Sequence, residues 1–486
     1  MILPREPPRT CLQGVGRQVR GVFSTECAAA ALGLYREHRG ERPVTAVIYT
    51  HSHGDHFGGV RGILPQDADV PIIAPSGFLE HAVSENVYAG TAMTRRAVYM
   101  YGAEVPKGPG GQIGAGLGMT ASTGTISLIP PTLDITRTGQ EEVVDGVRIV
   151  FQITPGTEAP SEMNFYFPDR RTVCMAENAT HNLHNLLTLR GAVVRNPHTW
   201  AHYLTEAIEL FTGKSDVLFA SHHWPTWGQE QITTFLTQQR DLYSYLHDQT
   251  LRLLNQGYTG TEIAEIIQLP PSLQEAWHTH GYYGSVSHNV KAIYQHYMGW
   301  FDGNPAHLWE LPPEQSARKH VEAMGGAAAV ISNATAALGR GELRWAAQVL
   351  NYAVFADPGS TEARELLAGT YQKLGHGAEN GTWRNFYLQG AAELRGHLAR
   401  TAIDTAGPDM AMALIRLQLS NGALIQTHPT DGEPAQLTLT LTKPQLLSML
   451  ATQSLDGIDT EGDPQALQRL LAVLDTPDKQ FAIVTP

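Results

Sequence analysis

The stretch Thr50-His51-Ser52-His53-Gly54-Asp55-His56 constrains the fold of this chain more than any other feature. It follows directly on a compact apolar run that predicts a buried strand. Side chains two apart on a strand share a face, so His51 and His53 project to the same side if the strand direction persists. Asp55 and His56 then fall on the turn into a helix. Imidazole and carboxylate suit Zn²⁺ and similar metals. The stretch therefore predicts one loop with ligands for two ions.

A polar loop with solvated histidines is the alternative interpretation, which the ligand spacing disfavours. The composition narrows the partners further. Lys and Arg number 34 against 47 acidic residues, a net charge of −13, which disfavours a nucleic-acid partner. The three cysteines, Cys11, Cys27 and Cys174, are too far apart for a disulfide framework or a cysteine zinc site. Because the net charge is negative, an anionic substrate would need a local basic pocket or a metal.

A length of 486 residues predicts two or three domains. No stretch approaches the roughly 20 uninterrupted apolar residues of a membrane span. The beginning of the chain, Met1-Ile2-Leu3-Pro4-Arg5, lacks the apolar core of a signal peptide, and the sequence leaves the cellular location open. Residues 1–23 are rich in Pro, Arg and Gly and show no period, so we expect them to be irregular.

Strand-like and helix-like patterns alternate before Pro312, which indicates a layered α/β domain. The pair Asp145-Gly146 is typical of a β-hairpin turn. The expected strands span residues 44–49, 70–74, 141–144, 147–153, 164–167, 171–175 and 217–220. The expected helices span residues 25–38, 77–103, 199–211 and 229–254, with one more from the histidine stretch to about residue 64.

Residues 107–131 are rich in Gly and Pro and predict a long loop inside this domain. Long loops in compact domains are usually functional or disordered. Either a lid or substrate channel, or a mobile loop with no role, fits the pattern. The glycines are not a nucleotide-binding fingerprint, because no strand-turn-helix pattern surrounds them.

The pattern changes from Pro312 onward. Residues 316–400 predict helices, with breaks at 339–341, 357–359 and 375–377, and residues 341–374 resemble one tetratricopeptide-type hairpin. Such a hairpin cannot bury its own apolar face, so we expect it to pack on neighbouring helices or on a second subunit. Strand-like runs at 415–419, 423–427 and 436–442, followed by helices, predict a small α+β domain.

Further metal ligands are expected at strand ends, where loops converge. Glu158, Glu177 and His222 each follow an apolar strand, as His51 does. Taken alone, a glutamate at a strand end is usually just solvated. Together with the histidine stretch, the three residues complete a set large enough for two ions. Spacing alone does not decide whether His222 or the adjacent His223 is the ligand.

The motif Thr-His-Ser-His-x-Asp-His resembles the signature of the metallo-β-lactamase superfamily. A wider set of stretches resembles one branch of it, the zinc-dependent alkyl sulfatases. The matching stretches are residues 49–60, 154–163, 174–186, 221–228 and 281–305. The resemblance implies a metallo-β-lactamase-like αββα sandwich, followed by an α-helical dimerisation domain and a small α+β sterol-carrier-like domain. It also implies a homodimer.

The resemblance also implies roles for individual residues. His51, His53 and Glu158 would hold one zinc, Asp55, His56 and His222 the second, and Glu177 would bridge them. His184 is a candidate acid or sulfate-binding group; the alternative is a helix-face histidine bonded to the backbone. The weaker candidates for binding the sulfate oxygens are Asn178, Arg190, Arg195 and Tyr283.

Hydrolysis of an alkyl sulfate to an alcohol and inorganic sulfate by zinc-bound hydroxide is the function that the resemblance implies. The sequence leaves open whether sulfur or carbon is attacked, and whether primary or secondary esters are used. Hydrolysis of another ester, such as a lactone or phosphodiester, is one alternative. An inactive module for lipid binding or assembly is another.

Family members resemble this chain from about Ser24 onward and carry a longer region before that point. We therefore expect a sandwich that is incomplete at its N-terminal side, and loss around residues 400–410. The predicted domains are 24–311 (catalytic), 312–400 (helical dimerisation) and 401–486 (sterol-carrier-like), after the irregular segment 1–23.

Overall fold

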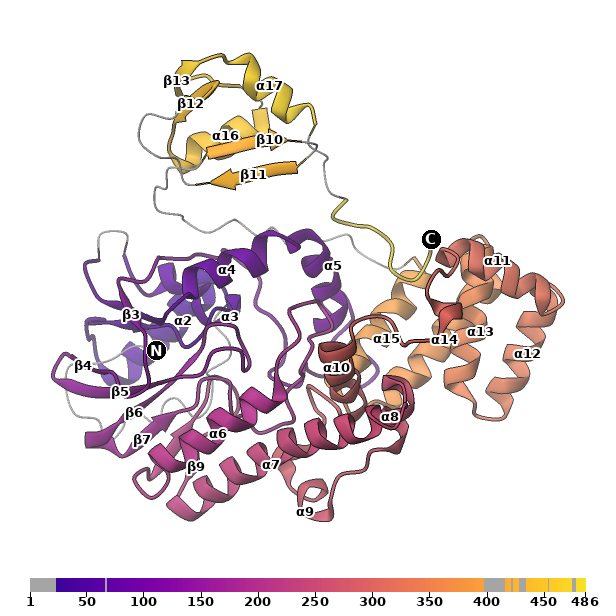
Figure 1. Ribbon diagram of the computed structural model, residues 1–486, viewed down its shortest axis with the longest axis horizontal. Coiled ribbons are helices and arrows are strands. Elements are labelled where there is room, and N and C mark those ends of the chain that lie inside the picture. Colours follow the sequence, from indigo (N-terminus) through magenta and orange to yellow (C-terminus); the bar gives the residue numbers. More distant parts are fainter. Residues whose placement is uncertain are drawn as a thin grey trace.

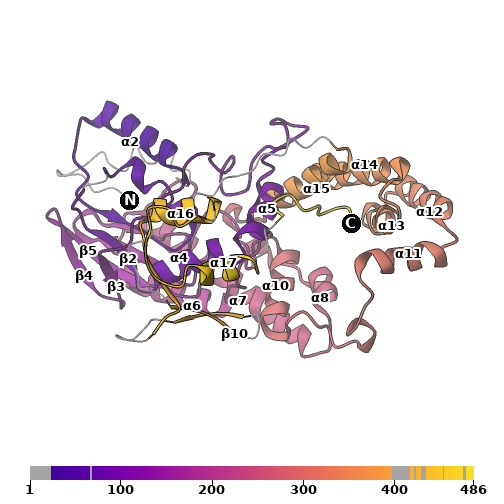
Figure 2. The same cartoon turned by 90° about the horizontal axis from the view of Figure 1, so that it is seen from above.

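The computed structural model describes residues 23–65, 68–396, 416–420, 423–427, 434–452, 454–473 and 478–486. The predictions for residues 1–22, and for a loss around residues 400–410, lie outside this described part. Figure 1 shows a layered α/β body, a helical lobe beside it, and a small α+β lobe on another side. The view in Figure 2 places α11–α14 at the end of the molecule opposite the strands β3–β5.

Two β-sheets form the centre of the α/β body. The small sheet is parallel, in the order β1-β2-β3. Its strands are β1 (Val47–Ile48), β2 (Ile72–Pro75) and β3 (Leu133–Ile135). The large sheet has the order β4-β5-β6-β7-β8-β9, and its one parallel pair is β7–β8. Its strands are β4 (Glu141–Val144), β5 (Val147–Ile153), β6 (Met163–Phe167), β7 (Thr172–Cys174), β8 (Val217–Phe219) and β9 (Thr226–Trp227).

The two sheets pack face to face. Ile48 of the small sheet shares a buried cluster with Phe151 and Phe165 of the large sheet. The neighbouring residue Val47 points to the opposite face, because side chains alternate along a strand, and there it packs with Phe78. The helices on that outer face are α3 (Gly54–Phe57) and α4 (Phe78–Val87), and α2 (Thr25–Arg39) precedes β1.

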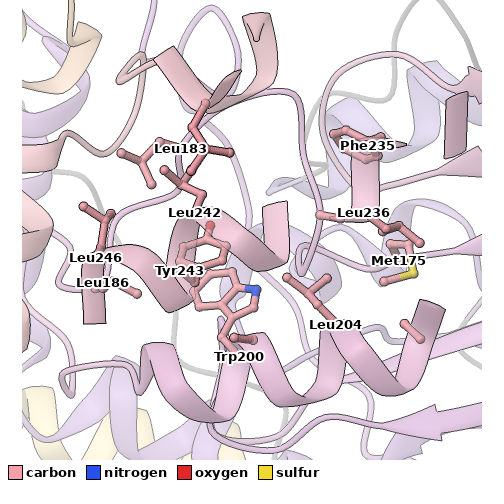
Figure 3. Close-up of a cluster of buried hydrophobic side chains, with 14 of the residues drawn as sticks. Met175, Leu183, Leu186, Trp200, Leu204, Phe235, Leu236, Leu242, Tyr243 and Leu246 are labelled. Carbon is pink, nitrogen blue, oxygen red and sulfur yellow. The ribbon is translucent and has the colours of Figure 1, made fainter. Parts of the chain in front are cut away.

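The outer face of the large sheet is covered by α6 (Pro197–Phe211) and α7 (Gln229–Leu254). Figure 3 shows the side chains of this layer, with Trp200 of α6 against Tyr243 of α7. Their rings stack with centroids 4.5 Å apart. Leu183 and Leu186 lie in the same cluster and hold the segment between them against α7. The layers therefore follow one another as helix, sheet, sheet and helix, which confirms the predicted αββα sandwich.

Three local predictions were wrong. Residues 77–103 form two helices, α4 and α5 (Gly90–Tyr101), because Ala89 leaves the helical path at φ −108° and ψ 20°. The predicted strand at 44–49 is reduced to the two residues of β1. The predicted helix after the histidine stretch is only α3 and a short turn at Val60–Gly62. The strands β3 and β9 were not predicted, because segments of two or three residues carry no measurable period.

A helical region follows the sandwich. It contains α8 (Gly260–Ile266), α9 (Pro271–Gln274), α10 (Val286–Met298), α11 (Pro313–Ala323), α12 (Ala327–Gly339), α13 (Leu343–Ala356), α14 (Thr361–Gly377) and α15 (Gly381–Leu394). The predicted break at 375–377 lies slightly later, at 378–380, since α14 runs to Gly377 and α15 begins at Gly381. A Cβ atom at Gly375 would come within 3.2 Å of the Arg384 carbonyl oxygen, so glycine here permits close contact between α14 and α15.

The small α+β lobe begins with the hairpin of β10 (Arg416–Ser420) and β11 (Ala423–Thr427). It continues with β12 (Leu437–Thr440), α16 (Lys443–Thr452), β13 (Asp459–Gly462) and α17 (Gln465–Leu471). The short β13, which pairs with β12, was not predicted. Among the described residues no single helix has the length and apolar character to cross a bilayer. Within the same described residues, only α11 and α12 taken together have that length and apolar character, and the chain bends by 84° between them.

Candidate metal centre

The predicted ligands lie where strands of both sheets end. His51 and His53 follow β1 of the small sheet. Glu158, Glu177 and His222 follow β5, β7 and β8 of the large sheet. Asp55 and His56 lie in α3, whose first residue is Gly54. The two sheets therefore bring all seven predicted ligands to one edge of the sandwich.

Glu177 is the centre of this group. Its Oε2 atom lies 3.3 Å from His51 Nε2, 3.0 Å from His56 Nε2 and 3.4 Å from His222 Nε2. Its side chain is only 3% exposed. One carboxylate oxygen therefore faces three imidazole nitrogens, two from the stretch that follows β1 and one from the loop that follows β8.

The other carboxylates complete two groups. Glu158 Oε2 lies 2.8 Å from His53 Nδ1 and 3.3 Å from His51 Nε2. Asp55 Oδ2 lies 3.2 Å from His56 Nε2 and 3.7 Å from His222 Nε2. Ligand atoms lie within 4.8 Å of one another inside each group. The first group is His51, His53, Glu158 and Glu177, and the second is Asp55, His56 and His222.

Several of these atoms are buried without a hydrogen bond. Nε2 of His51, His56 and His222, and Oε2 of Glu158, make no hydrogen bond to any described residue. Buried polar atoms in proteins are nearly always paired, so four orphaned atoms facing one space need an explanation. Imidazole nitrogen and carboxylate oxygen are suitable ligands for Zn²⁺ and similar metals. The side chains present therefore fit a divalent metal centre.

The charges in this centre are balanced by protons when no cation is bound. Burial alone would raise the pKa of Glu177, but the nearby histidines, His222 foremost, hold it well below its usual range. Burial would lower the pKa of His56, but Asp55 outweighs it and raises the pKa to about 10. His51 keeps the effect of burial, which lowers its pKa to about 4. Metal binding would displace such protons, because ligands bind in their deprotonated forms.

His184 lies between β7 and α6 and is 1% exposed. Its Nδ1 atom is 2.9 Å from the Asn185 carbonyl oxygen, and its Nε2 atom is 3.0 Å from Glu177 Oε1. Carbonyl and carboxylate oxygens accept hydrogen bonds, so each ring nitrogen of His184 faces an acceptor. The geometry therefore places a ring nitrogen that can donate a hydrogen bond beside Glu177.

Arg195 is engaged with Glu158, one of the predicted ligands, and with Asn185. It donates from Nη2 to Glu158 Oε1 and from Nε to the Glu158 carbonyl oxygen. Its Nη1 atom donates to the carbonyl oxygen of Asn185 at 3.0 Å. Arg195 thus fixes the orientation of Glu158, and these contacts do not favour its predicted role in sulfate binding, which stays a prediction.

Asn178 lies beneath the centre. Its Nδ2 atom donates to Thr154 Oγ1 at 3.0 Å and to Asn164 Oδ1 at 3.1 Å. Both N–H groups of the amide are used, so neither is left for a sulfate oxygen in this conformation. Its role in sulfate binding also stays a prediction, without support from these contacts.

Arg190 and Tyr283 lie on the side of His184 and His53. The ring of Tyr283 is 4.9 Å from that of His184, and burial raises the pKa of Tyr283 well above its usual range, so its hydroxyl stays a donor. Arg190 Nη2 donates to Glu85 Oε1 at 2.5 Å. Arg190 Nη1 also donates to the Gly191 carbonyl oxygen at 3.0 Å, and the roles of Arg190 and Tyr283 in sulfate binding stay predictions.

Sequence reasoning missed Glu85. This residue of α4 lies between Arg190 and His53, with its Oε2 atom 3.2 Å from His53 Nε2. A histidine ligand commonly donates its second ring N–H to a carboxylate, which fixes its tautomer. Glu85 therefore leaves His53 Nδ1 free to face Glu158 and a metal. The sequence carried no signal, because a glutamate in a helical pattern is usually solvated.

His223 is anchored away from the centre. Its Nδ1 atom accepts from the backbone N–H of His181 at 3.2 Å, and its Nε2 atom donates to the Gly116 carbonyl oxygen at 3.1 Å. With both ring nitrogens engaged, His223 cannot replace His222 as the ligand. The contact also ties the glycine-rich loop to the residue that follows His222.

The rest of the glycine-rich loop is held by α15. Arg384 donates from Nε to the Gly111 carbonyl oxygen at 2.9 Å, and Asn385 donates to the Gly114 carbonyl oxygen at 3.0 Å. Residues 107–131 contain neither helix nor strand, as predicted. Buried side chains of the helical region therefore fix a loop that reaches the metal centre.

Two of the predicted ligands, Glu177 and His222, lie next to a residue with positive φ. Ala176, immediately before Glu177, has φ +47°, and His223, immediately after His222, has φ +68°. The left-handed conformation costs about 1–2 kcal/mol for a residue with a side chain. The Ala176 carbonyl oxygen accepts from the Ser221 N–H at 2.7 Å, so the two strained turns are joined. Strain of this kind is typical of functional sites.

Comparison with known proteins gives a consistent result. Family models match residues 21–222 as the metallo-beta-lactamase superfamily, residues 259–397 as alkyl sulfatase dimerisation and residues 397–486 as alkyl sulfatase C-terminal. A linear primary-alkylsulfatase of Pseudomonas sp is 45% identical, with 96% of this chain and 76% of that protein covered. The alkyl/aryl-sulfatase BDS1 of Saccharomyces cerevisiae is 44% identical, with 96% and 79% covered.

A solved structure matches nearly the whole fold. The stereoselective inverting sec-alkylsulfatase Pisa1 from Pseudomonas sp. has a TM-score of 0.91 at 39% identity, with 96% of this chain and 81% of that chain covered. The similarity thus extends from the sandwich through the helical region and the α+β lobe. The likeness of the last region to sterol carrier proteins stays a prediction. The chain belongs to the alkyl sulfatase family of the metallo-β-lactamase superfamily.

Proposed function

We propose that this chain hydrolyses alkyl sulfate esters to an alcohol and inorganic sulfate at a centre of two zinc ions. The observation that carries the proposal is the convergence of six ligand-type side chains around a seventh, Glu177, in a chain 45% identical to a linear primary-alkylsulfatase. One zinc would be held by His51, His53 and Glu158 and the other by Asp55, His56 and His222, with Glu177 shared between them.

Zinc, when bound, would supply positive charge for the sulfate ester and lower the pKa of water to near 7. The chain itself would bind the sulfate oxygens through the guanidinium of Arg190 and the hydroxyl of Tyr283. If the oxygen of water bonds to sulfur as the bond between sulfur and the ester oxygen breaks, the leaving alkoxide would take a proton from His184 Nε2. If the bond between carbon and the ester oxygen breaks, sulfate leaves without needing that proton.

Release of free sulfate from dodecyl sulfate by the purified, zinc-loaded chain tests the proposed function. We expect turnover of dodecyl sulfate and little turnover of a lactone or a phosphodiester, measured under the same conditions. Hydrolysis of the lactone or the phosphodiester alone would favour the superfamily alternative. A chain that binds no metal but takes up fatty ligands would favour a lipid-binding module and refute the proposal.

We further propose that the helical region joins two copies of this chain. The segment from α10 to α11 exposes a run of large apolar side chains, with Trp309 96% exposed and Trp300 76% exposed. This segment lies inside residues 259–397, which match alkyl sulfatase dimerisation. A second copy would remove these side chains from water. We keep 24–311, 312–400 and 401–486 as the proposed domains.

Replacing Trp309 by lysine should weaken this dimer. Loss of a central aromatic contact costs about 2–4 kcal/mol, which raises the dissociation constant of the dimer by roughly 30- to 1,000-fold. Light scattering after size-exclusion chromatography measures the mass over a concentration series. Val143→Lys is the matched control, since Val143 is 70% exposed on β4 of the sandwich. Equal dimer mass for W309K and wild type at all concentrations would contradict the proposed interface.

A further inference from the structure

Glu162 lies just before β6 and is 1% exposed. Its backbone is part of the framework of the metal centre, because it forms an antiparallel bridge with His51. The flanking hydrogen bonds run from the Met163 N–H to the Thr50 carbonyl oxygen at 3.0 Å and from the Ser52 N–H to the Ser161 carbonyl oxygen at 3.2 Å. Glu162 is thus placed behind the first ligand loop.

The side chain of Glu162 connects the two glutamate loops. Its Oε2 atom accepts from the backbone N–H of Glu158 at 3.1 Å and from that of Ala159 at 3.1 Å. The same oxygen accepts from Thr157 Oγ1 at 2.8 Å. Its Oε1 atom accepts from the backbone N–H of Glu177 at 3.1 Å. One buried carboxylate therefore receives the N–H groups of both glutamates in the centre.

The Glu177 turn is the part that most needs such a contact. Ala176 holds φ +47° while fully buried, which an L-residue adopts only when the surroundings impose it. The hydrogen bond from the Glu177 N–H to Glu162 fixes the peptide group that joins Ala176 to Glu177. It thereby sets the direction in which the Glu177 side chain leaves the backbone.

We propose that Glu162 is a positioning residue that sets the separation and orientation of Glu158 and Glu177, and through them the metal affinity of the centre. The inference rests on the proposed metal centre and concerns a residue that is not itself a ligand. Its sequence position after a turn gives no hint of this role, because the four donors come from two loops that meet only in the folded chain.

Glu162→Gln tests the proposal with almost no change in size. The amide nitrogen of glutamine must face either the Thr157, Glu158 and Ala159 donors or the Glu177 N–H, so at least one contact becomes repulsive. We expect about 10- to 100-fold weaker zinc binding, the range found when partners of metal ligands are removed. Chelator competition measures zinc affinity, and the visible spectrum of the cobalt-loaded protein reports the altered coordination.

Glu206→Gln is the matched control, because Glu206 Oε2 also accepts from an amide, Gln152 Nε2 at 2.7 Å, but belongs to α6 and contacts none of the proposed ligands. It should leave zinc affinity and the cobalt spectrum unchanged. Adding Ala176→Gly to E162Q should recover part of the affinity, since glycine adopts positive φ without the imposed contact. If E162Q does not fold, Glu162→Asp, which keeps the charge but is too short to reach both loops, takes its place.

Zinc affinity and cobalt spectrum equal to wild type in E162Q would overturn the inference. So would equal losses of melting temperature in the zinc-loaded and metal-free proteins with unchanged affinity, since that pattern reports a purely structural role. Failure of the metal centre itself gives a different result. In that case wild type binds no zinc, and Glu177→Gln leaves metal content unchanged.

Discussion

Removal of metal by a chelator is expected to lower the release of sulfate from dodecyl sulfate by at least ~10⁴-fold, or about 5.5 kcal/mol, and added zinc is expected to restore it. Without cations the centre lacks the positive charge that would hold the sulfate ester and lower the pKa of water. The whole chain carries a net charge of −13 and offers no general attraction for a sulfate. Ion chromatography of free sulfate, with metal content measured on the same samples, follows both stages.

Variants separate loss of the ions from loss of the fold. His222→Ala removes a ligand and should reduce both metal content and turnover. His202→Ala, on the exposed side of α6, should change neither. Full activity in a sample shown to be free of metal would contradict the proposed centre. Recovery of activity after an exchange into buffer without a divalent cation would also contradict it.

His184→Gln is expected to lower kcat for dodecyl sulfate by about 10²–10⁴-fold, the usual contribution of a positioned general acid. Both ring nitrogens of His184 face acceptors, and Nε2 lies 3.0 Å from Glu177 Oε1 within the centre. Glutamine can keep a hydrogen bond there but cannot protonate a departing alkoxide. Steady-state kinetics on the zinc-loaded variant, with zinc content checked, gives the effect on kcat and KM separately.

The leaving group distinguishes an acid from a merely structural histidine. In the sulfate ester of an acidic phenol, the phenolate can leave without being protonated. H184Q should therefore lose far less activity on such an ester than on dodecyl sulfate. Equal losses on both substrates would contradict the acid role. A small loss on dodecyl sulfate, together with incorporation of oxygen from labelled water into the alcohol, would show that the bond to carbon breaks instead.

Much of the architecture could be predicted from two sources. Alternating strand-like and helix-like patterns indicated a layered α/β domain, and the resemblance implied the αββα sandwich. Strand-like runs such as Val147–Ile153 have clear period-two patterns, and the sandwich that they form was confirmed. The failures are short or context-dependent pieces. The two-residue strand β1 has no period of its own, and the break at Ala89 separates α4 from α5 within one continuous helical pattern. Such features depend on what packs against them.

The sequence by itself determined the types of ligand in the centre. His51 and His53 lie two residues apart just beyond β1, and Asp55 and His56 follow in α3, so their short separation in the sequence suffices to group them. Glu158, Glu177 and His222 could be added because each follows an apolar strand, and strand ends converge in a layered α/β fold. These rules depend on local sequence and need no knowledge of which loops come together in the folded chain.

Only the tertiary structure decided how the surrounding polar groups are used. Arg195, whose role in sulfate binding stays a prediction, is directed by the fold to Glu158 and Asn185. No role for Glu85 or Glu162 followed from the sequence, whereas in the structure Glu85 contacts His53 and the buried Glu162 accepts from the Glu177 N–H. A donor or acceptor can satisfy only a limited number of partners, and the partners available to it come from loops far apart in the chain. Sequence spacing carries no information about that competition, which is resolved only when the loops are brought together.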